Sequence, residues 1–256
     1  MSLFLYAEKV AHAQANHKAI EKITVTNPKM TVEEAYEVQK ISIEQTLSAE
    51  NRFIGWKMGL TSVAKQKQVG VEEPIYGRLT SQMNLQTNEL IAAEHIHPRV
   101  EAEVAFVFNK ELKGANLTPL EIWPAIENVF LALEVIDSRY ENFSFTLPDV
   151  VADNASSSKI LLSSQAFSPY EKNWADVKVK LYHNGEEKLE GTGAAVLGHP
   201  INSVIQLLNM LEKEGRGILP GQLVLTGGIT DAIHVAAGDE VVADYGDLGS
   251  LTLNVK

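Results

Sequence analysis

Three glutamates lie inside segments that otherwise have the composition of buried strands. Glu101 and Glu103 belong to an apolar, β-branched run at 99–108, and Glu134 belongs to another at 129–136. Residues two apart in a strand point to the same face, so we expect the first two carboxylates side by side. Paired carboxylates in an apolar strand repel each other and are costly to desolvate, and a divalent cation removes both penalties. Oxygen-only ligation favours Mg²⁺ or Mn²⁺ over zinc.

A solvated strand face with two ordinary glutamates is the alternative interpretation of this pair. The third acid, in a similar apolar setting, favours a metal-binding triad of Glu101, Glu103 and Glu134. Such a triad would leave the remaining octahedral positions to water and to a chelating substrate. The sequence does not specify how far apart the two strands lie.

Lys57 lies within a short apolar run, 53–58, that ends at Gly59. A lysine at a sheet edge commonly extends its ammonium into solvent. The alternative is a cation that faces the site and pairs with a substrate carboxylate or exchanges protons.

Two polar stretches also have two interpretations. The segments containing Ser156 and Thr226 are either plain loops or turns that offer hydroxyls and amides to an anion.

The composition excludes several other classes of site. The chain has 256 residues, 45% of them hydrophobic, and 22 basic against 33 acidic residues give a net charge of −11. We therefore expect neither nucleic-acid nor anionic-membrane binding. The absence of cysteine excludes disulfides, thiolate zinc sites and cysteine nucleophiles. There is no GxSxG, GxGxxG or P-loop pattern and no signal-peptide pattern, and we expect a cytoplasmic protein.

The elements that must position these residues change in type along the chain. The first third predicts a helix at 5–22, a second helix that begins with a capping box at 31–34, and a third at about 61–70. Farther along, the patterns predict a hairpin at 178–189 with an Asn-Gly turn and a helix at 200–214. The other expected strands are 53–58, 99–108, 129–136, 223–226, 240–245 and 251–255.

Helices that come first and strands that dominate later favour an α+β fold over a regular βαβ alternation. We expect an N-terminal helical region at 1–80, packed on a β-rich metal-binding core at 81–256, with both acting as one functional unit. The stretch 70–83 is a candidate lid over the site.

Several segments together resemble the hydratase/decarboxylase branch of the fumarylacetoacetate hydrolase superfamily. The resemblance covers nearly the whole chain from about residue 30 onward, in the same order. The segments that carry it are 55–62, 74–77, 98–103, 133–139, 151–157, 198–200, 226–230 and 246–250.

The resemblance implies a mixed β-sheet roll or sandwich and a Mg²⁺- or Mn²⁺-dependent lyase of aromatic meta-cleavage catabolism. It implies that the metal ligands are Glu101, Glu103 and Glu134 and that Lys57 is catalytic. It also implies substrate contacts from Tyr76, Ser156 and Thr226. By the same resemblance we expect a homo-oligomer that can associate with a 2-oxopent-4-enoate hydratase.

The branch contains a hydratase activity and a decarboxylase activity. Hydratases of this branch usually have an aspartate where this chain has Ile75, so an acid that would handle the proton of water is missing. The segments 136–143 and 193–200 are also more similar to decarboxylases. We therefore expect decarboxylation of 2-oxohex-3-enedioate, a 2-oxo dicarboxylate, to 2-hydroxypenta-2,4-dienoate and CO₂. The alternatives are 2-oxopent-4-enoate hydration and a non-catalytic, metal-binding partner of a hydratase. No His-Glu pair supports C–C bond hydrolysis.

Overall fold

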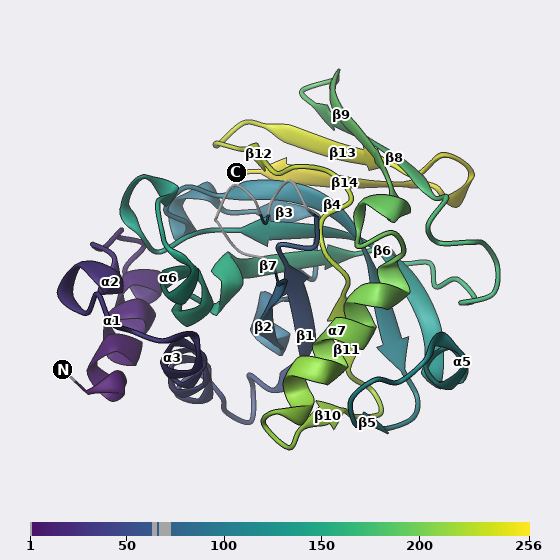
Figure 1. Ribbon diagram of the computed structural model, residues 1–256. Coiled ribbons are helices and arrows are strands. Elements are labelled where there is room, and N and C mark those ends of the chain that lie inside the picture. Colours follow the sequence, from purple (N-terminus) through teal and green to yellow (C-terminus); the bar gives the residue numbers. More distant parts are fainter. Residues whose placement is uncertain (1, 63–65, 67–72) are drawn as a thin grey trace.

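The computed structural model describes residues 2–62, 66 and 73–256 (Figure 1). The helices in this part of the chain are α1 (Leu3–Ala15), α2 (Ile23–Thr26), α3 (Val32–Glu44), α5 (Pro119–Ile122), α6 (Leu147–Ala152) and α7 (Pro200–Glu212). The strands are β1 (Phe53–Gly59), β2 (Ile75–Thr80), β3 (Glu89–Leu90), β4 (Arg99–Phe108), β5 (Leu112–Lys113), β6 (Ile126–Ile136), β7 (Ser157–Leu162), β8 (Lys178–His183), β9 (Glu186–Thr192), β10 (Gly217–Ile218), β11 (Leu223–Leu225), β12 (Ile233–His234), β13 (Glu240–Asp244) and β14 (Ser250–Val255).

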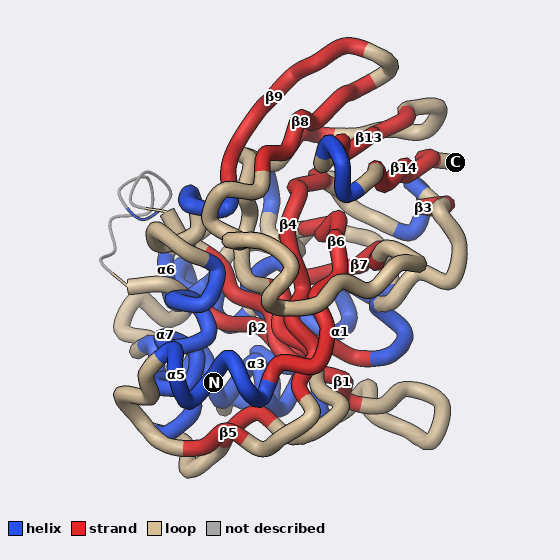
Figure 2. The backbone as a smooth tube through the Cα atoms, turned by 90° about the vertical axis from the view of Figure 1, so that its right-hand side faces the viewer, coloured by secondary structure: helices blue, strands red, loops and turns tan. Residues whose placement is uncertain are grey.

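The larger sheet curls on itself into a roll. Its strands run in the order β2-β1-β11-β4-β6-β7, and β12 pairs with β4. Asn84, just beyond β2, bridges to Ile160 of β7, and the amide of Leu85 donates to the carbonyl of Ile160 at 2.8 Å. The two ends of the strand order therefore meet, and side chains on one face of the sheet point into a common interior. Figure 2 shows β1, β2, β4, β6 and β7 of this sheet gathered in the middle of the molecule.

The two faces of β4 have different surroundings because side chains alternate along a strand. Val100, Ala102 and Val104 belong to the main apolar core, which the sheet shares with α7 and the smaller sheet. Glu101 and Glu103 point the other way, into the roll. Deeper in the roll an apolar cluster fills the interior, so the glutamates lie at the end of a packed core. This cluster includes Leu79, Ala105, Ala132, Ile160 and Leu225.

Helices from two distant parts of the chain cover one end of the roll. α1 and α3 share a second apolar core with α6, as their grouping in Figure 1 shows. The predicted capping box at Thr31 and Glu34 is confirmed. The predicted first helix was too long, because α1 ends at Ala15, and α6 was not predicted. Buried Gln39 of α3 donates to the carbonyls of β2 and α6 at 3.0 and 2.8 Å, which ties this layer to the sheet.

The smaller sheet, in the order β3-β14-β13-β8-β9, lies against the outer face of the roll (Figure 1). The predicted hairpin of β8 and β9 is confirmed, with Asn184 and Gly185 at φ angles of 53° and 80°. Both angles are positive, as a type I′ turn requires. Tyr245, after β13, places its buried hydroxyl 2.7 Å from the carbonyl of Glu103 and 2.8 Å from that of Ala132. The smaller sheet is thus linked to the backbone of the strands that carry the acids.

The stretch Gly193–Glu212 is long and apolar enough to cross a membrane by composition alone. Within it, α7 packs against the sheet, and this packing accounts for its apolar side chains. The buried side chains of α7 include Ile201, Val204, Leu207, Leu208 and Leu211.

Each predicted strand is present close to its expected bounds, but the strands β2, β3, β5, β7, β10 and β12 were not predicted. The helix expected at 61–70 lies mostly outside the described residues. The candidate lid at 70–83 is wrong for its described part, because Ile75–Thr80 is the buried strand β2. The division at residue 80 stays a prediction, and the sheet includes strands from both sides of it.

Candidate metal centre

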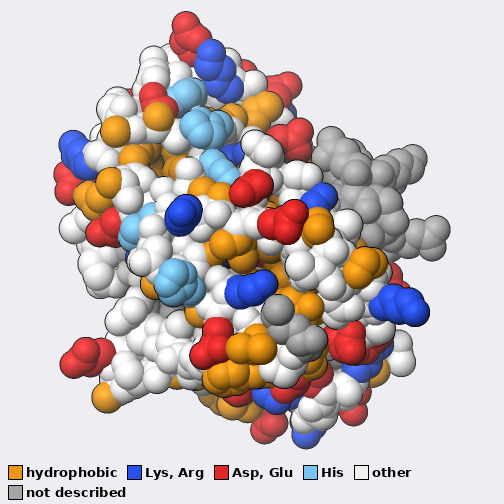
Figure 3. All heavy atoms as spheres, turned by 90° about the vertical axis from the view of Figure 1, so that its left-hand side faces the viewer, with side chains coloured by type: hydrophobic (Ala, Val, Ile, Leu, Met, Phe, Trp, Pro, Cys, Tyr) orange, Lys and Arg blue, Asp and Glu red, His pale blue; other side chains and the backbone are white. Residues whose placement is uncertain are grey.

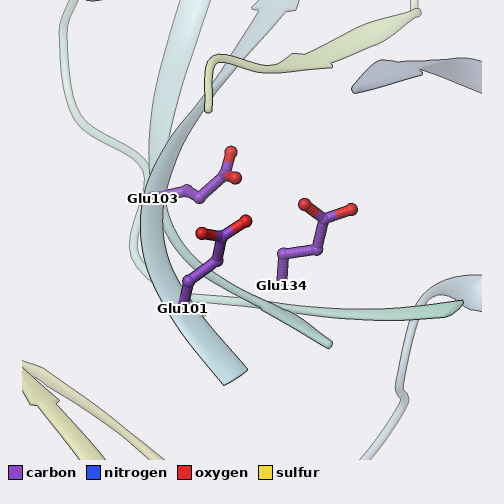
Figure 4. Close-up of side chains that lie close together, drawn as sticks. All are labelled: Glu101, Glu103 and Glu134. Atoms are coloured by element: carbon purple, nitrogen blue, oxygen red, sulfur yellow. The ribbon is translucent and has the colours of Figure 1, made fainter. Parts of the chain in front are cut away.

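The three predicted acids meet at one place because of the register between β4 and β6. The strands are antiparallel, with Glu101 directly opposite Glu134 and Glu103 opposite Ala132. Each glutamate offers an oxygen, and these atoms all lie within 4.8 Å of one another. Figure 4 shows the carboxylates converging from the two strands. The structure therefore brings together the triad that the apolar strands predicted.

Burial makes three ionised carboxylates at this place unfavourable without a cation. Glu103 and Glu134 have no exposed surface, and Glu101 is 6% exposed. Burial and the neighbouring carboxylates of Glu134 and Glu101 raise the pKa of Glu103 well above its ordinary value. Burial also raises the pKa of Glu134, and the nearby Lys57 opposes this shift. Oε1 of Glu103 has no hydrogen-bond partner among the described residues. Three close carboxylates with an unused buried oxygen fit a hard divalent cation that accepts oxygen ligands.

Two short contacts orient the carboxylates. The amide of Gly227 donates to Oε2 of Glu103 at 2.8 Å, and the hydroxyl of Ser157 donates to Oε1 of Glu134 at 3.1 Å. Partners of this kind hold metal ligands in place. The sequence pattern indicated Ser156 and Thr226 and missed these neighbours. In each case the segment was identified, and the local fold decided which group in it reaches the acids.

Lys57 points into the roll and not into solvent. Its side chain is buried, and Nζ lies 3.1 Å from Oε2 of Glu134 and 3.0 Å from the carbonyl of Ala155. Two strands separate β1 from β6 in the sheet order. Lys57 can therefore reach Glu134 only because the sheet curls. The solvent-directed interpretation of Lys57 is therefore wrong, and the ammonium is part of the carboxylate cluster.

The turn that carries Ala155 and Ser156 has an unusual backbone. Asn154, Ala155 and Ser156 have φ angles of 51°, 51° and 57°. Left-handed conformations are unfavourable for residues with a Cβ and persist where surrounding contacts enforce them.

Arg139 provides much of that enforcement. Its guanidinium donates to the carbonyls of Asp137 at 2.7 Å and Ser157 at 3.0 Å, and it forms a buried ion pair with Asp153. The side chain of Asn154 also accepts from the amide of Arg78 at 2.7 Å and donates to its carbonyl at 2.9 Å. These contacts hold the turn in the position at which it contacts Lys57 and Glu134.

A cavity of about 490 Å³ opens beside the carboxylates. Ser156 lines it, as predicted, together with Lys57 and Glu101. The charged and aromatic side chains that sequence reasoning missed here are Arg99, Phe143, Phe145 and Asp231. The lining also includes the aliphatic side chains of Leu60, Ile75, Ile136 and Val150.

The structure does not bring Tyr76 and Thr226 to this cavity. Tyr76 is opposite Met58 in the β1–β2 pairing, so it points to the other face of the sheet from Lys57. Its hydroxyl is hydrogen bonded to Glu214, and its ring stacks on Tyr36 at 4.3 Å. The hydroxyl of Thr226 donates to the carbonyl of Val104 at 3.0 Å.

The family model for the fumarylacetoacetate (FAA) hydrolase C-terminal domain matches residues 54–256. This chain therefore belongs to the fumarylacetoacetate hydrolase family. The expected α+β roll with helices at the N-terminus is confirmed.

Among curated proteins, the chain is similar to a 4-oxalocrotonate decarboxylase from Pseudomonas putida, with 40% identity over 96% of this chain and 94% of that protein. It is also similar to a 2-keto-4-pentenoate hydratase from Paraburkholderia xenovorans, with 35% identity over 96% of this chain and 91% of that protein. A similar solved structure is 4-oxalocrotonate decarboxylase from Pseudomonas putida G7 complexed with magnesium and adipate. It has a TM-score of 0.96 and 40% identity, and the match covers 99% of this chain and 97% of that one.

Proposed function

We propose that this chain decarboxylates 4-oxalocrotonate, which is 2-oxohex-3-enedioate, to 2-hydroxypenta-2,4-dienoate and CO₂ in aromatic meta-cleavage catabolism. The observation that carries the proposal is the 40% identity with a 4-oxalocrotonate decarboxylase over nearly the whole of both chains. The lining of the cavity favours this reaction over hydration. Ile75 lines the cavity with an aliphatic side chain, at the position where the hydratase interpretation requires a carboxyl group.

We assign Glu101, Glu103 and Glu134 as the ligands of Mg²⁺ or Mn²⁺. Their oxygens are close enough to bind one ion, and their burial leaves their charges unbalanced without it. The similar decarboxylase structure contains magnesium and adipate, and adipate is a six-carbon dicarboxylate like the proposed substrate. A divalent cation held at this site would act as a Lewis acid on the 2-oxo group, where negative charge develops as CO₂ leaves.

The reaction breaks the bond between C5 and C6 of the substrate. The bonding pair forms a double bond between C4 and C5, the C3–C4 pair moves to C2–C3, and the carbonyl pair moves onto the 2-oxo oxygen. Protonation of that oxygen gives 2-hydroxypenta-2,4-dienoate, and C6 departs as CO₂. The site must therefore stabilise charge at the 2-oxo end and deliver one proton there.

We assign Lys57 as the catalytic residue at this end of the cavity. Its ammonium lines the cavity and is held by Glu134 and the carbonyl of Ala155, so a proton on Nζ is positioned beside the carboxylates. Ser156 lines the cavity next to it and is retained as a substrate contact. We do not retain Tyr76 and Thr226, because their hydroxyls are bonded elsewhere.

The first test is CO₂ release by chelator-stripped protein given 4-oxalocrotonate with and without Mg²⁺ or Mn²⁺. We expect metal-dependent CO₂ release, and its loss in Glu134→Gln, which removes one ligand. Glu127→Gln is the matched control, because Glu127 lies on the same strand and is exposed. No CO₂, together with metal-dependent consumption of 2-hydroxypenta-2,4-dienoate, would assign the hydratase reaction instead. Metal binding with neither reaction would support a non-catalytic partner.

We also propose a cytoplasmic homo-oligomer that associates with a 2-oxopent-4-enoate hydratase. The product of the proposed reaction is the substrate of such a hydratase, so association would pass it directly to the next enzyme. Size-exclusion chromatography of the chain alone and mixed with the hydratase tests the homo-oligomer and the association. Elution of the mixture as two independent species would contradict the association.

A further inference from the structure

We propose that Arg99 binds the distal carboxylate of the substrate and thereby selects a dicarboxylate over a monocarboxylate of the same length. The inference rests on the proposed function for the class of substrate. Arg99 begins β4, lies two residues before Glu101 and lines the same cavity. Two residues along a strand span roughly 7 Å, which is comparable to the length of an extended six-carbon chain. A substrate held by its 2-oxo end near Glu101 would reach Arg99 with its other end.

The charges around the cavity require a second cation for such a substrate. At the carboxylate end, one divalent cation and Lys57 together balance three glutamates, so no positive charge remains there. Asp231 also lines the cavity and would repel an incoming carboxylate. Besides Lys57, Arg99 is the cationic side chain in the described lining. Figure 3 shows acidic and basic side chains interspersed on one face of the molecule. With a net charge of −11, attraction for a dianion must come from a local cation.

Arg99 is held ready for this contact. The centre of its guanidinium lies 4.0 Å from the centroid of the Phe143 ring. Nε of Arg99 is buried and has no hydrogen-bond partner among the described residues. Stacking on an aromatic ring restrains the plane of a guanidinium and leaves its edge available, and that edge matches a carboxylate with two parallel hydrogen bonds. The ring of His97 packs against the ring of Phe143, with 5.3 Å between the two ring centroids.

The chemistry determines which kinetic constant Arg99 affects. The carboxylate that it binds is the one that leaves as neutral CO₂, so this contact is stronger in the bound substrate than in the transition state. Arg99 therefore contributes to affinity and to the direction of the C5–C6 bond. Its loss should therefore raise KM, and the loss of this ground-state contact does not by itself lower kcat.

The test compares two ligands that share the 2-oxo acid end and the chain length. 2-Oxoadipate has the distal carboxylate and 2-oxohexanoate lacks it. Binding of each to the Mg²⁺-loaded protein is measured by calorimetry, for the wild type and for Arg99→Gln and Arg99→Lys. Arg52→Gln, which changes an exposed arginine just before β1, is the control.

We expect the wild type and the control to prefer 2-oxoadipate. Arg99→Gln should weaken 2-oxoadipate binding by roughly 10- to 100-fold and change 2-oxohexanoate binding by less than about two-fold. The affinity of Arg99→Lys for 2-oxoadipate should fall between those of the wild type and Arg99→Gln, because lysine keeps the charge and loses the paired hydrogen bonds.

Equal weakening of both ligands would overturn the inference, because it would place Arg99 at the shared 2-oxo end. A preference that survives in Arg99→Gln, or a wild type with no preference, would also overturn it. The readout needs no turnover. An Arg99-dependent preference in a protein that releases no CO₂ from 4-oxalocrotonate would refute the proposed reaction and leave the selectivity in place.

Discussion

Glu103→Gln separates the metal-binding role of the triad from its effect on stability. Glu103 is fully buried, and Glu101 and Glu134 add to the effect of burial in raising its pKa. One of its oxygens accepts from Gly227, and the other has no partner among the described residues. A glutamine keeps the acceptor for Gly227 and presents an NH₂ group to the two remaining carboxylates. The substitution therefore removes charge repulsion without leaving the amide of Gly227 unpaired.

The expected effects on the melting temperature have opposite signs with and without metal. Without metal, Glu103→Gln should melt at the same temperature as the wild type or higher, because it buries one charge fewer. At a Mg²⁺ concentration about 100-fold above Kd, binding stabilises the wild type by roughly 2.7 kcal/mol. For a chain of this size, that corresponds to a rise of roughly 5–10 °C. Glu103→Gln should lose most of this rise, because it lacks one of three ligands.

The pH dependence of the metal-free wild type has a definite direction. Burial raises the folded-state pKa of Glu103 above its unfolded value, so the folded state binds this proton more readily. The stabilising contribution is complete below the ordinary glutamate pKa and is lost as pH rises through the raised pKa. In Glu103→Gln the part of this pH-dependent loss of stability that comes from Glu103 should disappear.

The assay is differential scanning calorimetry of chelated and Mg²⁺-loaded protein over a pH series, with Glu127→Gln as the exposed control. A full Mg²⁺-dependent rise in Glu103→Gln would refute the assignment of Glu103 as a ligand. A metal-free variant that melts several degrees below the wild type would refute the account of charge repulsion.

Three further substitutions test separate parts of the site. Lys57→Met should lower kcat by roughly 100-fold or more. Its Mg²⁺ affinity should stay the same or rise, because a competing positive charge is removed. Unchanged turnover in a steady-state assay would contradict the catalytic assignment of Lys57. Arg139→Met should destabilise the fold by roughly 3–5 kcal/mol in urea unfolding, because it leaves the buried carboxylate of Asp153 unpaired. A loss of stability below about 1 kcal/mol would contradict the role of Arg139 in holding the turn. Tyr76→Phe should leave KM unchanged, because the hydroxyl contacts Glu214 on the other face of the sheet, and a large rise in KM would restore Tyr76 as a substrate contact.

The sequence alone determined the features that depend on neighbouring residues. The spacing of Glu101 and Glu103 within an apolar strand placed both on one face, because side chains alternate in any strand. The capping box at 31–34 and the Asn-Gly turn at 184–185 likewise follow from local hydrogen bonding and allowed φ angles. The composition of these segments therefore predicted the acids of the metal centre before their distances were known.

Only the tertiary structure decided which groups complete the site. The register that sets Glu134 opposite Glu101 depends on which faces of β4 and β6 the cores bury, and strand pairing is not a local property. The curl of the sheet brings Lys57 to Glu134 across the interior. The left-handed turn directs Ser157 toward Glu134 and leaves Ser156 in the cavity wall. Arg99 belongs to the segment 98–103 that carries the family resemblance, but only the cavity shows what its side chain faces. These outcomes depend on long-range packing, which neither the alternation of side chains along a strand nor a turn motif encodes.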